Sequence, residues 1–164
     1  MQQLTKGARY PVTFSLNGQE VTGHAEPRTL LSDFLTHEIG ITSCHVGCEH
    51  GVCGACTILV DGVVSRACLI FAVQVDGTKI QTAEGLTIVD GELTDLQKAF
   101  KKHHGLQCGY CTPGILMSVT AYLEENPKPT EEEIRDMLSG HLCRCTGYVG
   151  IVKAILDYCE NRDG

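Results

Sequence analysis

Residues 47–57 of this chain read GCEHGVCGACT, which places Cys48, Cys53 and Cys56 in one short segment. A fourth cysteine, Cys68, follows on the next predicted strand pair. The segment shows neither helical nor strand periodicity, so we predict a loop that turns its sulfur atoms inward. Positive φ at the glycines of this loop would let backbone N–H groups approach the sulfur atoms. These glycines are Gly47, Gly51 and Gly54.

The order C-x4-C-x2-C followed by a distant cysteine is that of plant-type [2Fe–2S] sites, in which four thiolates hold two irons. Zinc also accepts four cysteines, but zinc ribbons usually use two C-x2–4-C pairs rather than a triple and a single. A Rieske site needs two histidines. Cys48-Glu49-His50 could supply one of them, but no cysteine in the chain is followed three places later by histidine. His45 and His50 are therefore interpreted as polar loop residues.

A second set of cysteines combines Cys108-x2-Cys111 with Cys143-x-Cys145. Both pairs precede predicted helices, whose N-termini favour the negative charge of a thiolate-bound cluster. A thioredoxin-like dithiol is the competing interpretation of the first pair. It would need a preceding β-strand, whereas residues 93–104 have helical periodicity, and it would leave the second pair without a role.

Ten cysteines in 164 residues indicate metal binding or redox chemistry, because the N-terminus has no apolar run of the length of an export signal. Cys44 and Cys159 lie outside both sets. Cys159 is predicted to be a small buried apolar residue of a helix. Cys44 could compete with Cys48 for iron.

The N-terminal half predicts an α+β domain over residues 1–83. A hairpin is expected at 10–23 with an Asn-Gly turn, followed by a short helix capped by Thr29. A second hairpin over 57–68 and a strand at 79–82 follow the cysteine loop.

The C-terminal half, residues 84–164, predicts four helices and no strand. Apolar residues recur at helical spacing in 93–100, then after the Thr112-Pro113 pair as far as Asn126. Thr130 opens a capping box for a third helix that Gly140 ends. A fourth helix is expected from Tyr148 to Tyr158.

Charge and hydropathy exclude two classes of partner. The formal charge of −7 disfavours nucleic acid, which would need a basic surface. The longest apolar run, Ala67–Val73, is too short to cross a bilayer. We therefore expect a cytoplasmic protein with no nucleic-acid partner and no membrane insertion.

Four motifs together resemble the small iron–sulfur subunit of the molybdenum hydroxylases, the family of xanthine dehydrogenase, aldehyde oxidoreductase and carbon monoxide dehydrogenase. They are GCEHGVCGACT at 47–57, Asp-Gly at 61–62, QCGYCTPG at 107–114 and LCRCTGY at 142–148. The resemblance covers residues 10–158. It implies a β-grasp plant-type ferredoxin-like domain followed by a four-helix bundle domain, each with one [2Fe–2S] cluster.

The resemblance also implies site residues by position. The cluster near the molybdopterin would be held by Cys108, Cys111, Cys143 and Cys145, and the distal one by Cys48, Cys53, Cys56 and Cys68. Gln107 would contact the pterin, and Cys145 would be the ligand closest to it. Cys44 departs from the family pattern and receives no role.

The implied function is an electron-transfer subunit of a molybdopterin-dependent oxidoreductase, with no catalytic residue of its own. Electrons would pass from molybdenum to FAD while a partner chain hydroxylates a small molecule, with an N-heteroaromatic compound or an aldehyde favoured. A large molybdopterin-binding and a medium FAD-binding subunit would be the partners, in a heterotrimer or its dimer. The alternatives are a free-standing ferredoxin-like carrier and a zinc-binding interaction module.

Overall fold

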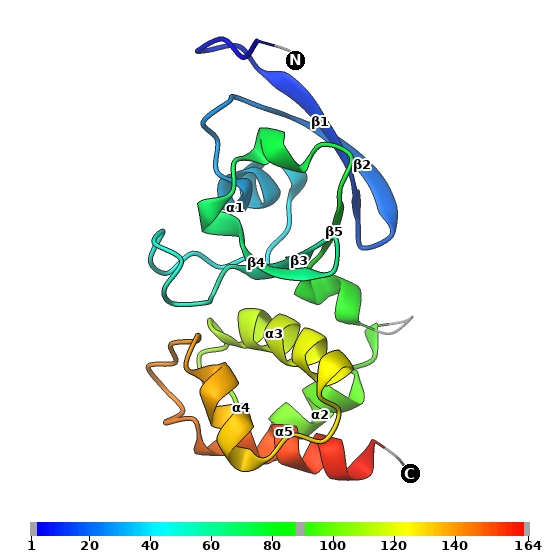
Figure 1. Ribbon diagram of the computed structural model, residues 1–164, viewed down its shortest axis with the longest axis vertical. Helices are drawn as coiled ribbons and strands as arrows, with labels where there is room; N and C mark the ends of the chain where they lie inside the picture. Colours follow the sequence, from blue (N-terminus) through cyan, green and yellow to red (C-terminus); the bar gives the residue numbers. More distant parts are fainter. Residues whose placement is uncertain (1–2, 88–90, 163–164) are drawn as a thin grey trace.

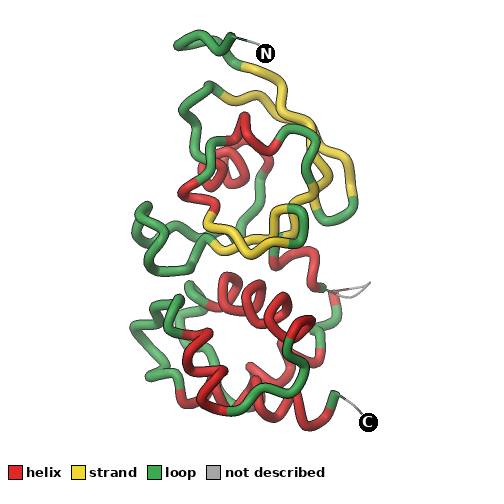
Figure 2. Tube along the Cα trace, in the orientation of Figure 1, coloured by secondary structure: helices red, strands yellow, loops and turns green. Residues whose placement is uncertain are grey.

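The computed structural model describes residues 3–87 and 91–162 and has two halves that follow each other along the chain (Figure 1). Within the described residues, every strand lies in the N-terminal half, and helices α2 to α5 make up the C-terminal half (Figure 2). The predicted α+β class is confirmed.

Five strands form one mixed sheet with the order β2-β1-β5-β3-β4. They are β1 (Tyr10–Leu16), β2 (Gln19–Ala25), β3 (Thr57–Val60), β4 (Val63–Arg66) and β5 (Lys79–Gln81). Strand β1 is antiparallel to β2 and parallel to β5, and β3 is antiparallel to β4 and β5. Both predicted hairpins are present, and their turns have positive φ at Asn17, Gly18, Asp61 and Gly62. Such turns match the twist of the paired strands.

A short helix packs on one face of this sheet. It begins as α1 (Leu31–Asp33) and continues as a π-helical turn over Phe34–Ile39. The rings of Phe14 and Phe34 lie 6.0 Å apart in the core. The predicted cap at Thr29 is wrong, because no side chain caps this helix. The Thr29 carbonyl instead accepts the N–H of Ala72, so this stretch pairs with a neighbouring segment.

The second hairpin is shorter than predicted. Strand β4 ends at Arg66, and Cys68 lies in a 3₁₀ turn over Ala67–Leu69. The N–H of Ala67 bonds to the carbonyl oxygen of Cys56 at 3.1 Å, which places the turn against the end of the cysteine loop.

Four helices form the C-terminal half: α2 (Asp95–Lys102), α3 (Thr112–Glu125), α4 (Glu131–Leu138) and α5 (Val149–Asn161). The Thr130 capping box is confirmed, since its side chain accepts the N–H of Glu133. The predicted Thr112 cap is wrong, because Cys111 occupies the cap position. A further capping box, which was not predicted, opens α2 at Thr94, and Leu93 lies outside that helix.

The buried apolar side chains form two clusters, one within residues 12–80 and the other within residues 96–155. The halves meet where the start of α3 approaches the cysteine loop. A Cβ added at Gly114 would collide with the carbonyl oxygen of Gly54 and lie 2.9 Å from that of Ala55. Only a glycine therefore allows this approach.

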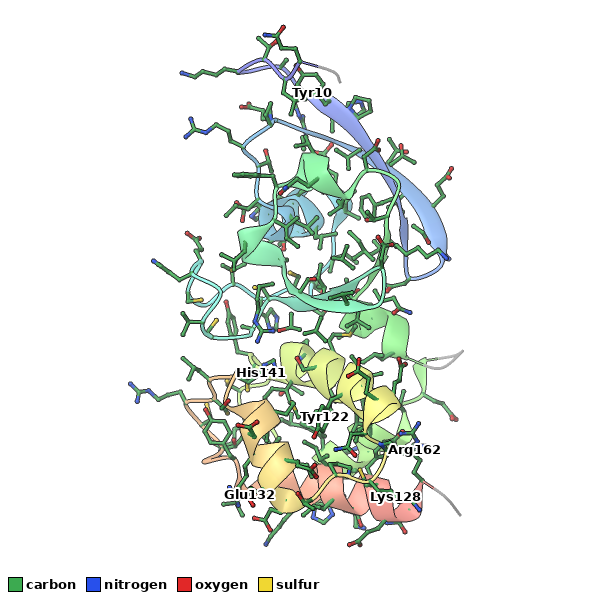
Figure 3. All side chains as sticks on the ribbon, viewed as in Figure 1. Tyr10, Tyr122, Lys128, Glu132, His141 and Arg162 are labelled. Atoms are coloured by element: carbon green, nitrogen blue, oxygen red, sulfur yellow. The ribbon has the colours of Figure 1, made fainter. Side chains whose placement is uncertain are left out.

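A further contact crosses the same junction. The Arg66 guanidinium donates to the Gly140 carbonyl at 2.9 Å and also bonds to the Thr57 hydroxyl. His141 is buried beside them, where Figure 3 shows it between the two halves. Its Nε2 lies 2.7 Å from Ser118 Oγ, and burial, followed by the charge of Arg66, lowers its pKa to about 4. His141 is therefore neutral at physiological pH.

No helix among the described residues has both the length and the apolar character needed to cross a membrane.

Candidate metal centres

The first set of cysteines lies around the loop that leads into β3. Cys56 and Cys68 are buried, while Cys48 and Cys53 are half-buried. Because β3 and β4 form a hairpin, the turn that carries Cys68 returns beside Cys56, and their thiols are in hydrogen-bonding contact. Cys48 and Cys53 make a similar contact. All four predicted residues of this set are thus brought to one place.

Hydrogen bonds and burial shift the pKa values of the thiols in this loop in opposite directions. The Cys48 sulfur accepts the N–H groups of Cys53 and His50, each at 3.4 Å. These bonds, that of Cys53 first, lower the pKa of Cys48 to about 6. Burial, followed by the neighbouring thiol of Cys56, raises the pKa of Cys68 to about 11. A cation is therefore needed to make all four thiols anionic at neutral pH.

The glycine prediction is right at two of three positions. Gly51 and Gly54 have φ of 74° and 75°, whereas Gly47 is absent from the positive-φ residues, and Glu49 takes the left-handed conformation instead. Space rather than φ restricts Gly47, because a Cβ there would lie 3.2 Å from Cys53 Sγ.

The second set lies at the starts of two helices. Cys111 caps α3, Cys108 precedes it on an exposed turn, and Cys143 and Cys145 lie in the loop before α5. The sulfur atoms of Cys108 and Cys145 are 3.5 Å apart, and the thiols of Cys111 and Cys143 are also in contact. Each cysteine of the C-x2-C motif therefore contacts a cysteine of the other motif. Because α2 precedes the motif, a thioredoxin-like dithiol is not supported.

Burial and hydrogen bonds together set the pKa values within the second set. It raises the pKa of Cys111 to about 12, with the Cys143 thiol as the next cause. Burial also opposes ionisation of Cys143, but hydrogen bonds from the Thr146 side chain and N–H outweigh it and lower the pKa of this thiol. The Cys145 pKa is raised, first by the bond to Cys108.

The thiols of each set approach one another in pairs. In a [2Fe–2S] cluster each iron takes two thiolates and shares two sulfides with the other iron, so two thiol pairs are the expected arrangement. Both sets fit the binuclear cluster.

Gln107 and Cys145, the two residues predicted to lie next to a pterin, are neighbours in the structure. The Gln107 side-chain amide donates to the Cys145 carbonyl at 2.9 Å, and Gln107 is exposed. The bond holds this amide against the backbone of the exposed thiol pair.

The structure also locates the two remaining cysteines. Cys44 is buried in the first core cluster, with Cys56 and Cys68 among the thiols that influence it, rather than Cys48. Burial first, then these neighbours, raises its pKa to about 12. Cys159 is only half-buried and packs against the second core cluster.

An interlock that the sequence does not predict joins the two cysteine loops. The ring of His45 stacks on that of Tyr110, with centroids 4.5 Å apart and an interplanar angle of 16°. His45 Nδ1 lies 2.7 Å from the Tyr110 carbonyl, and the Tyr110 hydroxyl donates to the Val46 carbonyl at 2.8 Å. A tyrosine between two metal-ligand candidates was the available signal, but its partner is distant in sequence.

Comparison with protein families gives two matches that span most of the chain. Residues 14–86 match the 2Fe-2S iron-sulfur cluster binding domain, and residues 82–156 match the [2Fe-2S] binding domain.

Individual relatives are similar over nearly their full length. The nicotine 6-hydroxylase small subunit of Paenarthrobacter nicotinovorans is 53% identical, covering 91% of this chain and 89% of its own. Caffeine dehydrogenase subunit gamma of Pseudomonas sp. (strain CBB1) is 51% identical, covering 88% and 87%. The xanthine dehydrogenase iron-sulfur-binding subunit of Escherichia coli O157:H7 is 47% identical, covering 89% and 91%.

Among solved structures, quinoline 2-oxidoreductase from Pseudomonas putida 86 has a chain with a TM-score of 0.89 and 46% identity, covering 92% of this chain and 93% of its own. The aldehyde oxidoreductase of Desulfovibrio desulfuricans gives a TM-score of 0.88 at 39% identity. That match covers 94% of this chain and 17% of the longer one.

Proposed function

This chain belongs to the small iron–sulfur subunits of the molybdenum hydroxylases, and we propose that its two thiol sets have different partners within that function. It is an electron-transfer subunit with two [2Fe–2S] domains, and a partner chain oxidises the substrate. The assignment of two clusters with different partners rests on one observation: the thiols approach one another in pairs, in two separate sets.

The second set is proposed to hold the cluster next to the molybdopterin. Its ligands would be Cys108, Cys111, Cys143 and Cys145. Cys108 is exposed, and the adjacent Gln107 amide is held beside Cys145, where it can reach a pterin edge. When bound, the clusters accept and release single electrons. The protein positions them and adjusts their potentials through burial and hydrogen bonds.

The first set is proposed to hold the distal cluster, which faces FAD. Its ligands would be Cys48, Cys53, Cys56 and Cys68. Backbone N–H groups bonded to Cys48 would favour the reduced state of a cluster there, because they stabilise added negative charge.

The sheet with its packed short helix supports a β-grasp ferredoxin-like domain over residues 1–83. The helices α2 to α5 support a four-helix bundle domain over residues 84–164. The boundary falls between the two apolar clusters, and it stays a prediction.

Exposed apolar side chains around each cysteine loop support two protein partners. Three of them surround the first set: Val52, Leu69 and Phe71, exposed to 62%, 62% and 44%. Another three flank the second: Leu106, Leu142 and Val149. Exposed apolar groups of this kind mark contact surfaces.

We assign the surface around the first set to a medium FAD-binding subunit and that around the second to a large molybdopterin-binding subunit, in a heterotrimer or its dimer. The charge of −7 supports the absence of a nucleic-acid partner. Free thiols at all ten cysteines support a cytoplasmic location.

The proposed substrate class of the complex is an N-heteroaromatic compound. The names of several relatives refer to nicotine, caffeine, xanthine and quinoline, which all contain nitrogen rings. The large subunit would bind the substrate, so the purified complex should be assayed with these rings and with aldehydes. Turnover of aldehydes alone would contradict this assignment.

The subunit function is tested by purifying the tagged chain from its native source. We expect far larger chains to co-elute, about four irons per chain, and two distinct EPR signals after dithionite reduction. A stable monomer with both clusters would favour the free-standing ferredoxin-like carrier. A colourless protein would favour zinc, and a single signal with about two irons would overturn the two-cluster assignment.

A further inference from the structure

Thr146 follows directly after the second cysteine pair, and its side chain contacts a sulfur atom. Thr146 Oγ1 lies 3.1 Å from Cys143 Sγ, and the Thr146 N–H donates to the same sulfur at 3.4 Å. The Cys143 sulfur therefore contacts both the hydroxyl and the backbone N–H of a single residue, Thr146.

The direction of the hydroxyl bond follows from the other contact of Thr146. The N–H of Tyr148 donates to Thr146 Oγ1 at 3.2 Å, so one lone pair of that oxygen is occupied. A thiolate carries no proton and can only accept. When Cys143 is a ligand, the Thr146 hydroxyl must therefore donate its proton to the sulfur.

The surrounding loop holds the hydroxyl in this position. Tyr148 adopts the left-handed conformation with φ of 68°, which turns its N–H back toward Thr146. Its own hydroxyl accepts the N–H of Cys143 at 2.8 Å and donates to the His141 carbonyl at 3.0 Å. Both ends of the loop are therefore fixed, and contacts within the protein set the position of the Thr146 side chain.

We propose that the Thr146 hydroxyl raises the reduction potential of the cluster held by the second set, through its hydrogen bond to Cys143. This inference rests on the proposed function, because it assumes a cluster on these four thiols. Reduction adds negative charge to the cluster, and a hydrogen bond to a ligand sulfur stabilises that charge. Thr146 is a positioning residue, since it acts through Cys143 without binding metal.

The test is an EPR-monitored redox titration of the purified complex carrying Thr146→Val. Valine keeps the shape and the backbone N–H but removes the hydroxyl. We expect one of the two cluster signals to require a lower potential for half-reduction, by about tenfold in the equilibrium constant, or about 59 mV for a one-electron couple. The other signal should keep its midpoint. Thr146→Ser should restore the wild-type value.

Thr112→Val is the matched control, because it removes a hydroxyl next to Cys111 that has no hydrogen-bond partner among the described residues. Its midpoint should shift by less than the Thr146→Val midpoint. Unchanged midpoints in Thr146→Val would overturn the proposal, as would an equal shift in Thr112→Val. Loss of the cluster signal in both Thr146→Val and Thr146→Ala, with retention in Thr146→Ser, would also overturn it, because the hydroxyl would then be needed for holding the cluster.

The wild-type complex separates this proposal from the function on which it rests. Two signals in the wild type with no midpoint change in the variant refute only the role of Thr146. Fewer than two signals in the wild type refute the two-cluster function itself.

Discussion

The backbone N–H of Leu142 donates a hydrogen bond to the carbonyl oxygen of Cys53 over 2.9 Å. Leu142 precedes Cys143, so this bond joins the two thiol sets through a residue of the first and a neighbour of the second. The Arg66 bond to Gly140 and the stacked His45 and Tyr110 rings reinforce the same junction. The two cysteine loops thus form one continuous structure between the halves of the chain.

The first prediction concerns the interlock of His45 and Tyr110. His45→Phe keeps a ring for stacking but loses the Nδ1 bond to the Tyr110 carbonyl, and Tyr110→Phe loses the bond to Val46. Each should weaken the magnetic coupling between the two reduced clusters in EPR spectra, because the loops would no longer hold a fixed separation. His37→Phe, on an exposed turn, is the control. Full coupling in both variants would mean that the Leu142 and Arg66 bonds suffice.

The second prediction separates a predicted ligand from another buried cysteine. Cys111 and Cys44 are exposed to 8% and 4%. Cys111→Ser should lower the iron content from about four to about two per chain, whereas Cys44→Ser should leave it near four. Iron analysis and EPR of the purified complex measure both. If Cys44→Ser also lost two irons, the assignment of the first set would be wrong.

Replacing Cys108 by serine should have a separate consequence for electron flow. Substrate should still reduce molybdenum, but FAD should no longer receive electrons, because the relay between them is broken. Rapid mixing of the complex with substrate, followed by the flavin absorbance, checks this outcome. Normal flavin reduction would contradict the placement of the second set next to the pterin.

The third prediction tests the junction itself. Gly114→Ala should destabilise the chain by about 1–3 kcal/mol, although alanine favours helices, because the added Cβ collides with the carbonyl groups of Gly54 and Ala55. Thermal unfolding followed by circular dichroism should show a lower midpoint than wild type. Glu124→Ala, exposed on the same helix α3, should change stability by no more than about 0.5 kcal/mol. An unchanged midpoint for Gly114→Ala would show that the halves separate readily.

The fourth prediction concerns Glu84, which fixes the segment before the first cysteine loop. Its carboxylate accepts hydrogen bonds from the N–H groups of Thr42 and Ser43 and from the Thr82 hydroxyl. Burial opposes ionisation, but these bonds, with the Ser43 hydroxyl first, outweigh it and lower the pKa of Glu84 to about 2 from 4.5. Its stabilising effect is therefore fully present above pH 4.5 and is lost as the pH falls toward 2.

Glu84→Gln should therefore cost about 1–2 kcal/mol, with allowance for solvent screening of a half-buried group. Urea unfolding should show that the difference from wild type stays constant between about pH 8 and pH 5. It should shrink only below pH 4.5, where the carboxylate of the unfolded chain gains its proton while that of the folded chain stays ionised down to about pH 2. The exposed Glu124→Gln serves as the control. A difference that varies between pH 8 and pH 5 would contradict the depressed pKa.

Local patterns carried much of the prediction. The turn at Asn17 and the capping box at Thr130 depend on residues close in sequence, and the structure contains both. The spacing of the cysteines predicted two groups of four thiols, and the structure brings the members of each group near one another. The caps expected at Thr29 and Thr112 failed because tertiary contacts decided those positions. The Thr29 carbonyl pairs with Ala72, and the chain reaches α3 through Cys111.

Contacts between distant segments could not be predicted from spacing. The cross-pairing of Cys108 with Cys145 depends on how the helices of the C-terminal half pack, and the stacking of His45 on Tyr110 depends on how the two halves pack. The role of Thr146 was also hidden, because a threonine after a cysteine has many uses. The structure indicates its role, because the Thr146 hydroxyl lies between the Cys143 sulfur and the Tyr148 N–H.

The 3.5 Å separation of the Cys108 and Cys145 sulfur atoms has a consequence for how the protein must be made. Until iron arrives, two adjacent thiols, one of them exposed, can be oxidised by dioxygen to a disulfide, with both thiol protons and two electrons passing to the oxidant. That bond would occupy two of the four sulfur atoms and block assembly until it is reduced. Protein expressed under iron limitation in air should therefore accumulate a trapped form that a reductant such as dithiothreitol rescues, and loading is best done without oxygen.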